Sequence, residues 1–109
     1  HSMPAPSPSP QAKQAPSGQA AGNDAAVIKE FQAINEKMHK DMAIPLTGKV
    51  DVDFVKGMIP HHQGAIDMAE VVLKYSENAK IRKLARDIVK AQKSEIAMMK
   101  AWLAANEKK

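Results

Sequence analysis

DFVKGMIPHHQGAIDMAEVVLKY, residues 53–75, is the stretch of this sequence that decides the fold. Two adjacent stripes run along it at spacings of three and four residues, as the apolar face of a helix requires. One stripe consists of Phe54, Met58, His61, Ala65, Met68, Val72 and Tyr75, and the other of Val55, Ile59, His62, Ile66, Ala69 and Leu73. Because both stripes are largely apolar, we expect this helix to be the central one of the fold.

Pro60 interrupts this helical pattern. Proline has no backbone N–H, its ring clashes with the preceding turn, and it pushes the residue before it away from helical angles. A kink or a short break is therefore predicted between Gly57 and Pro60. A true break would place Pro60 in the first turn of an additional helix.

A further helix is predicted on each side of the central one. Before it, an inward stripe follows a capping position at Asn23 or Asp24 and ends ahead of a connector over residues 43–50. That stripe consists of Val27, Phe31, Ile34, Met38 and Met42. After a connector around residues 76–78, the last stripe consists of Ile81, Ala85, Ile88, Gln92, Ile96, Met99 and Leu103. The sequence thus predicts an all-α, up-down antiparallel bundle of three helices, or four if the break at Pro60 is complete.

Residues 1–23 differ in composition from the rest of the chain. Five of the first sixteen positions are proline, and no hydrophobic period is present. They predict a flexible, disordered Pro/Ser/Ala-rich leader, followed by one helical metal-binding domain over residues 24–109. The leader resembles the spacer that follows a removed export signal, so the mature protein is expected to be periplasmic or secreted.

Charge and hydropathy argue against nucleic-acid and membrane-spanning classes. The net charge is +4, but the lysines alternate with Glu and Asp along the predicted helices, as on a solvated face. No apolar run approaches the roughly 20 residues that span a bilayer. The chain has no cysteine, so neither a disulfide nor a thiolate ligand is available.

Methionine and histidine gather in three clusters outside the leader. The antiparallel order brings the end of the first helix, the start of the second and the end of the third to one pole of the bundle. At about 1.5 Å per residue, Met38, Met58 and Met98 should lie within about two turns of the same height. The clusters are residues 38–42 (MHKDM), residues 58–62 (MIPHH) and the pair Met98-Met99.

The spacing within these clusters suits chelation of a soft metal ion. Met58 and His62 are four residues apart, as are Met38 and Met42, so each pair shares one helix face. Thioethers favour Cu(I) and Ag(I), and imidazole also accepts Cu(II). We therefore expect copper, Cu(I) in preference to Cu(II), with silver as a substitute. Met98 and Met99 point about 100° apart, so one of them is expected to face a site.

MIPHHQGAIDMA, residues 58–69, resembles the signature of the domain-of-unknown-function-305 family, and so do residues 38–42, Asp53-Phe54 and residues 91–102. The resemblance covers roughly residues 31–103. It implies a ferritin-like fold and copper binding in the bacterial envelope, for sequestration, tolerance or delivery, with other copper-handling envelope proteins as partners. The ligands that it implies are Met38, His39, Met42, Met58, His61, His62 and Met68, with Met98 or Met99 added.

Two other functions stay open at this stage. In a copper-dependent oxidase, histidines such as His61 and His62 would hold a redox-active ion with an open position. In a metal-free helical adaptor, Met and His would only form a packing surface. A carboxylate-bridged di-metal enzyme needs two Glu-x-x-His motifs, and the chain has one, Glu36 to His39. We expect a binding protein rather than an enzyme, and a homodimer that closes the methionine-rich pole is compatible with the sequence.

Overall fold

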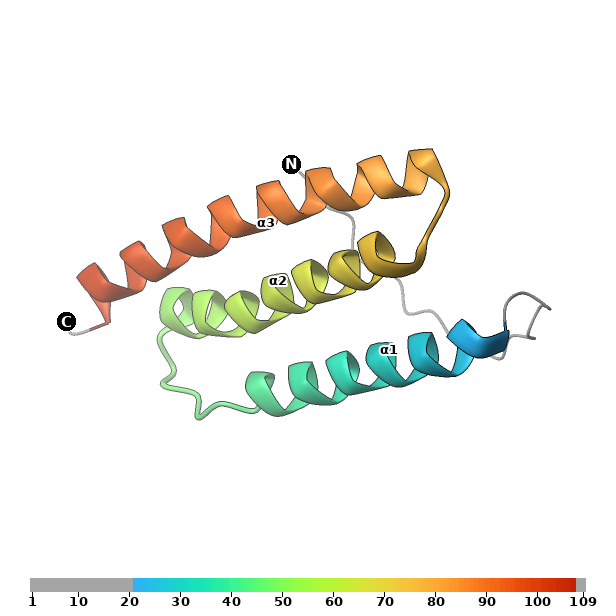
Figure 1. Ribbon diagram of the computed structural model, residues 1–109. Coiled ribbons are helices and arrows are strands. Elements are labelled where there is room, and N and C mark those ends of the chain that lie inside the picture. Colours follow the sequence, from blue (N-terminus) through green and yellow to red (C-terminus); the bar gives the residue numbers. More distant parts are fainter. Residues whose placement is uncertain (1–20, 108–109) are drawn as a thin grey trace.

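Three helices make up residues 21–107, the part of the chain that the computed structural model describes (Figure 1). They are α1 (Ala21–Met42), α2 (Val50–Tyr75) and α3 (Ala79–Asn106). The predicted all-helical, up-down-up order is confirmed, and most of the predicted leader, residues 1–20, lies outside the described residues. Within the described residues no helix is both long enough and apolar enough to cross a membrane.

α1 and α2 begin slightly earlier than the sequence indicates. Asn23 and Asp24, expected to cap α1, lie inside its first turn, where the carboxylate of Asp24 favours the positive end of the helix dipole. α2 begins at Val50, the last residue of the predicted connector, and Asp51 and Asp53 lie in its first turn. The domain boundary predicted between residues 23 and 24 therefore falls within a helix.

α2 runs through Pro60 without interruption, so neither the predicted break nor a fourth helix is present in residues 21–107. The carbonyl of Lys56 receives no N–H from position 60, a cost of about 3 kcal/mol together with the ring clash. Packing against α1 and α3 along the rest of α2 outweighs this local cost. A kink at Pro60 and a ferritin-like relationship stay predictions.

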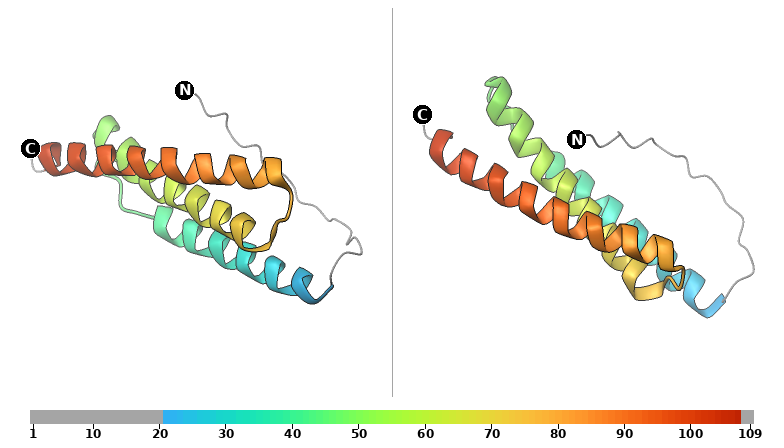
Figure 2. Two further views of the ribbon diagram at one scale, coloured as in Figure 1. Left: turned by 45° about the horizontal axis from the view of Figure 1, so that its top comes forward. Right: turned by 90° about the horizontal axis from the view of Figure 1, so that it is seen from above.

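The three helices form one layer with α2 in the middle (Figures 1 and 2). α2 packs against both neighbours, whereas α1 and α3 do not contact each other within the described residues. The radius of gyration is 16.1 Å, compared with about 12–13 Å for a compact chain of this length. The buried core is correspondingly small and consists of Val52, Ile66, Ala69, Val71, Ala85, Ile96 and Met99.

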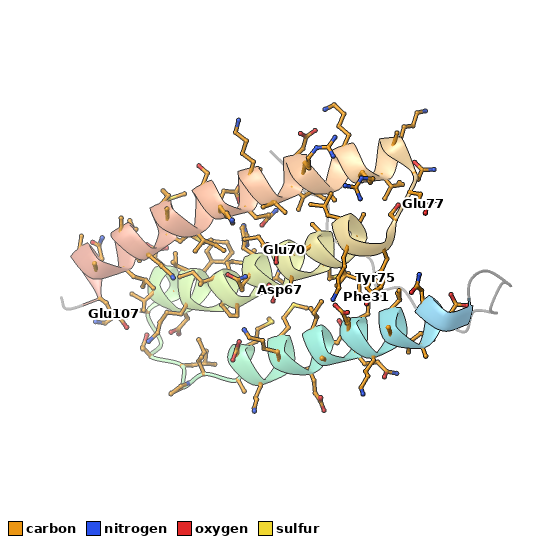
Figure 3. All side chains as sticks on the ribbon, viewed as in Figure 1. Phe31, Asp67, Glu70, Tyr75, Glu77 and Glu107 are labelled. Carbon is orange, nitrogen blue, oxygen red and sulfur yellow. The ribbon has the colours of Figure 1, made fainter. Side chains whose placement is uncertain are left out.

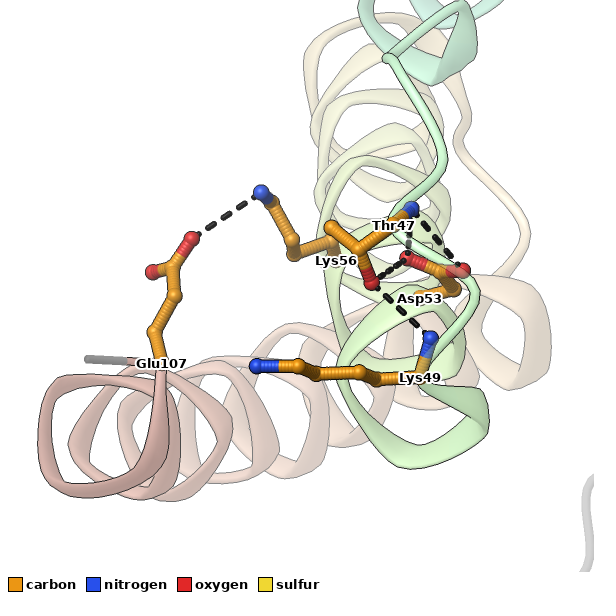
Figure 4. A network of polar contacts seen from close by, with 5 residues as sticks. All are labelled: Thr47, Lys49, Asp53, Lys56 and Glu107. Carbon is orange, nitrogen blue, oxygen red and sulfur yellow. Dashed lines mark hydrogen bonds and ion pairs between the residues drawn. The ribbon is translucent and has the colours of Figure 1, made fainter. Parts of the chain in front are cut away.

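Asp53 fixes the connector between α1 and α2 (Figure 4). Its carboxylate accepts hydrogen bonds from the backbone N–H of Thr47 (2.9 Å) and of Gly48 (2.9 Å), and from the Thr47 hydroxyl (2.9 Å). The φ angle of Gly48 is +91°, a region that side chains other than glycine rarely adopt. The backbone N–H of Thr47, more than any other group, holds the pKa of Asp53 below its ordinary value.

Ion pairs tie each outer helix to α2. At one end, Glu30 of α1 accepts from the hydroxyl of Tyr75 (2.7 Å) and from Nζ of Lys74 (2.8 Å). Hydrogen bonding to Lys74, and secondly to Tyr75, lowers the pKa of Glu30, and the same carboxylate raises the pKa of Tyr75. At the other end, Lys56 pairs with Glu107, the C-cap of α3, at 2.9 Å (Figure 4). These contacts set the antiparallel register of both helix pairs.

The connector between α2 and α3 forms at residues 76–78, where it was predicted. Oδ1 of Asn78 accepts from the N–H of Ile81 (3.0 Å) and caps α3. Nη1 of Arg82 donates to the carbonyls of Leu73 (2.7 Å) and Ser76 (3.1 Å), which satisfies backbone acceptors at the end of α2.

Asp53→Asn should lower the thermal midpoint at neutral pH, because an uncharged amide is a weaker acceptor for the connector N–H groups. The pKa of Asp53 in the folded chain lies below its ordinary value of 3.8, so its stabilising contribution is present above that value. The contribution is lost as pH falls through the lowered pKa. The difference between wild type and variant, followed by circular dichroism melts, should therefore shrink in acid.

The control for this experiment is Asp51→Asn, which removes the same charge from an exposed position in the same helical turn. It should lower the midpoint less than Asp53→Asn does. A difference between wild type and Asp53→Asn that is independent of pH would contradict the role of the carboxylate.

Candidate metal centre

The three methionine and histidine clusters lie at one end of the molecule, where α1 ends, α2 begins and α3 ends (Figure 1). The side chain of Met38 lies against Gly64, six residues or about 9 Å along α2 from Met58. Glu95 of α3 contacts His62 of α2, which places Met98, three residues further along α3, near the height of Met58. The predicted similarity in height is therefore present.

His62 is held at both of its ring nitrogens. Nδ1 lies 2.9 Å from the backbone carbonyl of Met58, and Nε2 lies 2.6 Å from Oε1 of Glu95. A carbonyl only accepts, so Nδ1 carries a proton and donates it to Met58. Nε2 then either donates a second proton to Glu95 or offers its lone pair to an ion. The side chain is 12% exposed, so this nitrogen sits in a half-buried position between α2 and α3.

Two thioethers belong to the same side of α2. Met58 lies one turn before His62 and packs, half-buried, against the core cluster of Ile66, Ile96 and Met99. Met99 is 7% exposed. Of the adjacent pair in α3, Met99 is thus the one that faces α2, as the prediction of a single inward side chain requires. We call Met58, His62, Glu95 and Met99 the α2–α3 donor group.

Met38 points from α1 to the opposite side of α2. A Cβ atom at position 64 would lie 2.6 Å from the sulfur of Met38, so the thioether occupies the space that glycine leaves. Met42 follows one turn later in α1, and His61 lies three residues before Gly64 on the same side of α2. We call Met38, Met42 and His61 the α1–α2 donor group.

The two donor groups are separated by α2 itself. Positions 62 and 64 point about 200° apart on a helix, toward α3 and toward α1 respectively. Because α1 and α3 do not contact each other within residues 21–107, the predicted ligands do not meet in one pocket of a single chain. The predicted donors therefore lie at similar heights along the helices, as expected. They do not share one neighbourhood, because they lie on opposite sides of α2.

Three predicted ligands belong to neither group. Met98 is 61% exposed and Met68 is 41% exposed. His39 is exposed and projects about 100° away from Met38 around α1. The structure thus leaves these three donors, His39, Met68 and Met98, uncovered.

Glu95 is a residue that reasoning from the sequence did not identify. It lies one turn before Met99 in α3, and the antiparallel register places it opposite His62. In the sequence, Glu95 could have been recognised by its position four residues before Met99. Carboxylates on a solvated helix face are often found at the same spacing from an apolar residue, so this spacing does not single out Glu95. Within residues 21–107, no three His, Asp or Glu side chains come together as a metal-ligand set.

Comparison with known proteins identifies one family. The family model described as domain of unknown function (DUF305) matches residues 51–109, slightly more than half of the chain. A relative, the uncharacterized protein L153 of Acanthamoeba polyphaga mimivirus, is 38% identical over 53 residues. The match spans 49% of this chain and 35% of the viral protein, about a third of its length.

The packing of Met38 against Gly64 predicts different outcomes for two glycine substitutions in α2. Gly57→Ala should raise the free energy of unfolding by about 0.5–1 kcal/mol, since alanine favours the helix and its Cβ meets nothing within 4 Å. Gly64→Ala has the same helical gain but displaces the sulfur of Met38, so it should be less stable than Gly57→Ala by about 1 kcal/mol or more.

Urea denaturation measures both variants, and a double-mutant cycle isolates the contact. In a Met38→Ala background, Gly64→Ala should become stabilising because the obstacle is gone. If the two glycine substitutions change the free energy of unfolding equally in both backgrounds, Met38 does not pack against Gly64.

Proposed function

The chain belongs to the DUF305 family, and we propose that it is a copper-binding protein that takes up Cu(I), with Ag(I) as a substitute, through methionine and histidine side chains. One observation carries this proposal: a histidine ring, anchored at Nδ1 on the backbone carbonyl of Met58, directs Nε2 toward α3 in a half-buried position, on the flank of α2 where Met58 packs against the core cluster that contains Met99. Metal-binding histidines commonly use such an anchor to fix the ligand nitrogen.

The donors of the α2–α3 group match the charge and softness of a monovalent ion. Thioether sulfur and neutral imidazole favour Cu(I) and Ag(I) over harder cations. The carboxylate of Glu95, 33% exposed, lies at the same nitrogen and balances a single positive charge. Nε2 of His62 would bind the ion through its lone pair, with Glu95 beside it.

The α1–α2 group supplies a second place for an ion. Met38 and Met42 lie one turn apart on α1, and His61 lies three residues before Gly64, the residue of α2 that Met38 contacts. Because α2 separates the two groups, the proposal is two ions per chain that do not share a ligand.

The proposed role is to hold copper rather than to transform a substrate. The α2–α3 donors are rigidly packed side chains, and holding the ion there serves sequestration, tolerance or delivery. We place this role in the bacterial envelope, as the periplasmic or secreted form of the protein, with other copper-handling proteins of the envelope as its partners. Oxygen consumption by the copper-loaded protein would instead identify an oxidase.

Anaerobic titration with Cu(I) against a chromophoric chelator, followed by native mass spectrometry, tests the proposal. Wild type should retain two ions per chain. Met58→Leu and Met99→Leu keep the volume and apolarity of the side chain while removing the sulfur. Each should weaken Cu(I) binding about 10-fold or more at one of the two sites.

Met98→Leu is the matched control, since its sulfur is exposed and points away from His62. It should leave affinity at the α2–α3 group unchanged. Retention of neither Cu(I) nor Ag(I) by the wild-type chain would contradict the proposal and favour a metal-free adaptor.

A further inference from the structure

The two faces of the helical layer differ in polarity. On α2, residues at spacings of seven, four, three and four form a polar stripe: Lys56, Gln63, Asp67, Glu70 and Lys74. Figure 3 shows Asp67 and Glu70 of this stripe along the middle helix. The same spacing on the opposite side of α2 gives an apolar stripe: Phe54, His61, Ala65, Met68 and Val72.

The outer helices continue this division. The ion pairs Lys74–Glu30 and Lys56–Glu107 join α2 to its neighbours along the polar side of the layer. The helical period then places the other flank of each outer helix beside the apolar stripe of α2. These flanks carry Ile28, His39 and Met42 on α1, and Ile81, Leu84, Met98 and Trp102 on α3. We call this surface the apolar face.

The apolar face holds the exposed large hydrophobic residues of all three helices. Phe54 is 62% exposed, Met98 61% and Ile28 56%. At about 150–200 Å² for a fully uncovered residue of this size, the exposed set amounts to about 800 Å², more than the few hundred Å² usual for a monomer. The set is Ile28, Met42, Val50, Phe54, Met68, Ile81, Leu84 and Met98.

We propose that a second copy of this chain covers the apolar face, so that two three-helix layers pack face to face. The exposed area equals the roughly 800 Å² that each partner contributes to a stable interface. A face that meets its own copy about a two-fold axis must tolerate its own charges. Lys80 and Asp87 share the flank of α3 with Met98, so the face carries charges of both signs, which a two-fold arrangement can place opposite one another.

By composition, residues 1–20 offer little apolar surface for this face. Residues 1–20 contain one large apolar side chain, Met3, among proline, serine, alanine and glutamine. Such a segment has too little apolar surface to replace water over three helices. A copy of the chain has a matching face of the same size.

Self-association also gives the uncovered donors a partner, an inference that rests on the proposed function. His39, Met68 and Met98 all lie on or beside the apolar face. A two-fold axis that passes beside Met68 would bring Met68 of both copies near each other. A thioether pair from two chains then forms a further soft site that a single chain lacks.

Sedimentation equilibrium of the full chain, kept metal-free with a chelator, tests the association itself. The expected mass is twice 11.8 kDa at about 100 µM protein, where a micromolar dimer is saturated. Leu84→Glu and Met98→Glu should each weaken dimerisation about 30-fold or more, because each buries a charge in the apolar interface. Both side chains are exposed in the single chain, so helix content by circular dichroism should not change.

Ala97→Glu is the matched control for Met98→Glu. It places the same charge on the neighbouring residue, which is exposed and points about 100° away from the apolar face. This variant should dimerise as wild type does. A monomeric wild type, or equal loss of dimer in Ala97→Glu and Met98→Glu, overturns the proposal.

The outcomes separate self-association from copper binding. A monomer that still retains Cu(I) at Met58 and His62 overturns the dimer and leaves the proposed function standing. A dimer that retains no copper does the reverse. A monomer that binds anionic lipid vesicles, and loses that binding in Phe54→Glu, would assign the apolar face to a membrane surface and overturn self-association.

Discussion

The packing of α2 against two neighbours at once is the constraint on which the structure depends. Every contact between helices in residues 21–107 has α2 on one side, so the core consists of its two flanks and what faces them. With so few buried residues, apolar burial alone leaves a small margin. The carboxylates of Asp53, Glu30 and Glu107 therefore matter for register, because each joins α2 to the connector or helix beside it.

This arrangement also explains why the candidate metal centre is divided. A compact bundle would turn the ends of α1 and α3 toward each other, whereas here α2 lies between them (Figure 2). Each flank of α2 carries its own histidine and faces its own methionines. His62 combines a side chain that is 12% exposed with hydrogen bonds at both nitrogens, which makes it the most defined donor in the described part of the chain.

Much of the fold follows from hydrophobic period and caps, because these act locally. The connector at residues 76–78 is an example, since Asn78 is both a turn residue and a cap. The local rule failed at Pro60, where packing over the whole helix outweighs one lost hydrogen bond. Glu95 and the separation of α1 from α3 were not predictable in the same way. Both depend on which stripe of α2 faces which neighbour, and two equally apolar stripes do not specify that choice.

The contact between Met38 and Gly64 has a consequence for oxidative chemistry. The sulfur packs against the glycine, so oxidation to a sulfoxide would place a polar oxygen at the contact between α1 and α2. Oxidation at this position would replace a soft donor with a polar group and push α1 away from α2. Oxidation of the Met38 sulfur would therefore weaken both the packing of α1 on α2 and the proposed metal binding by the α1–α2 donor group.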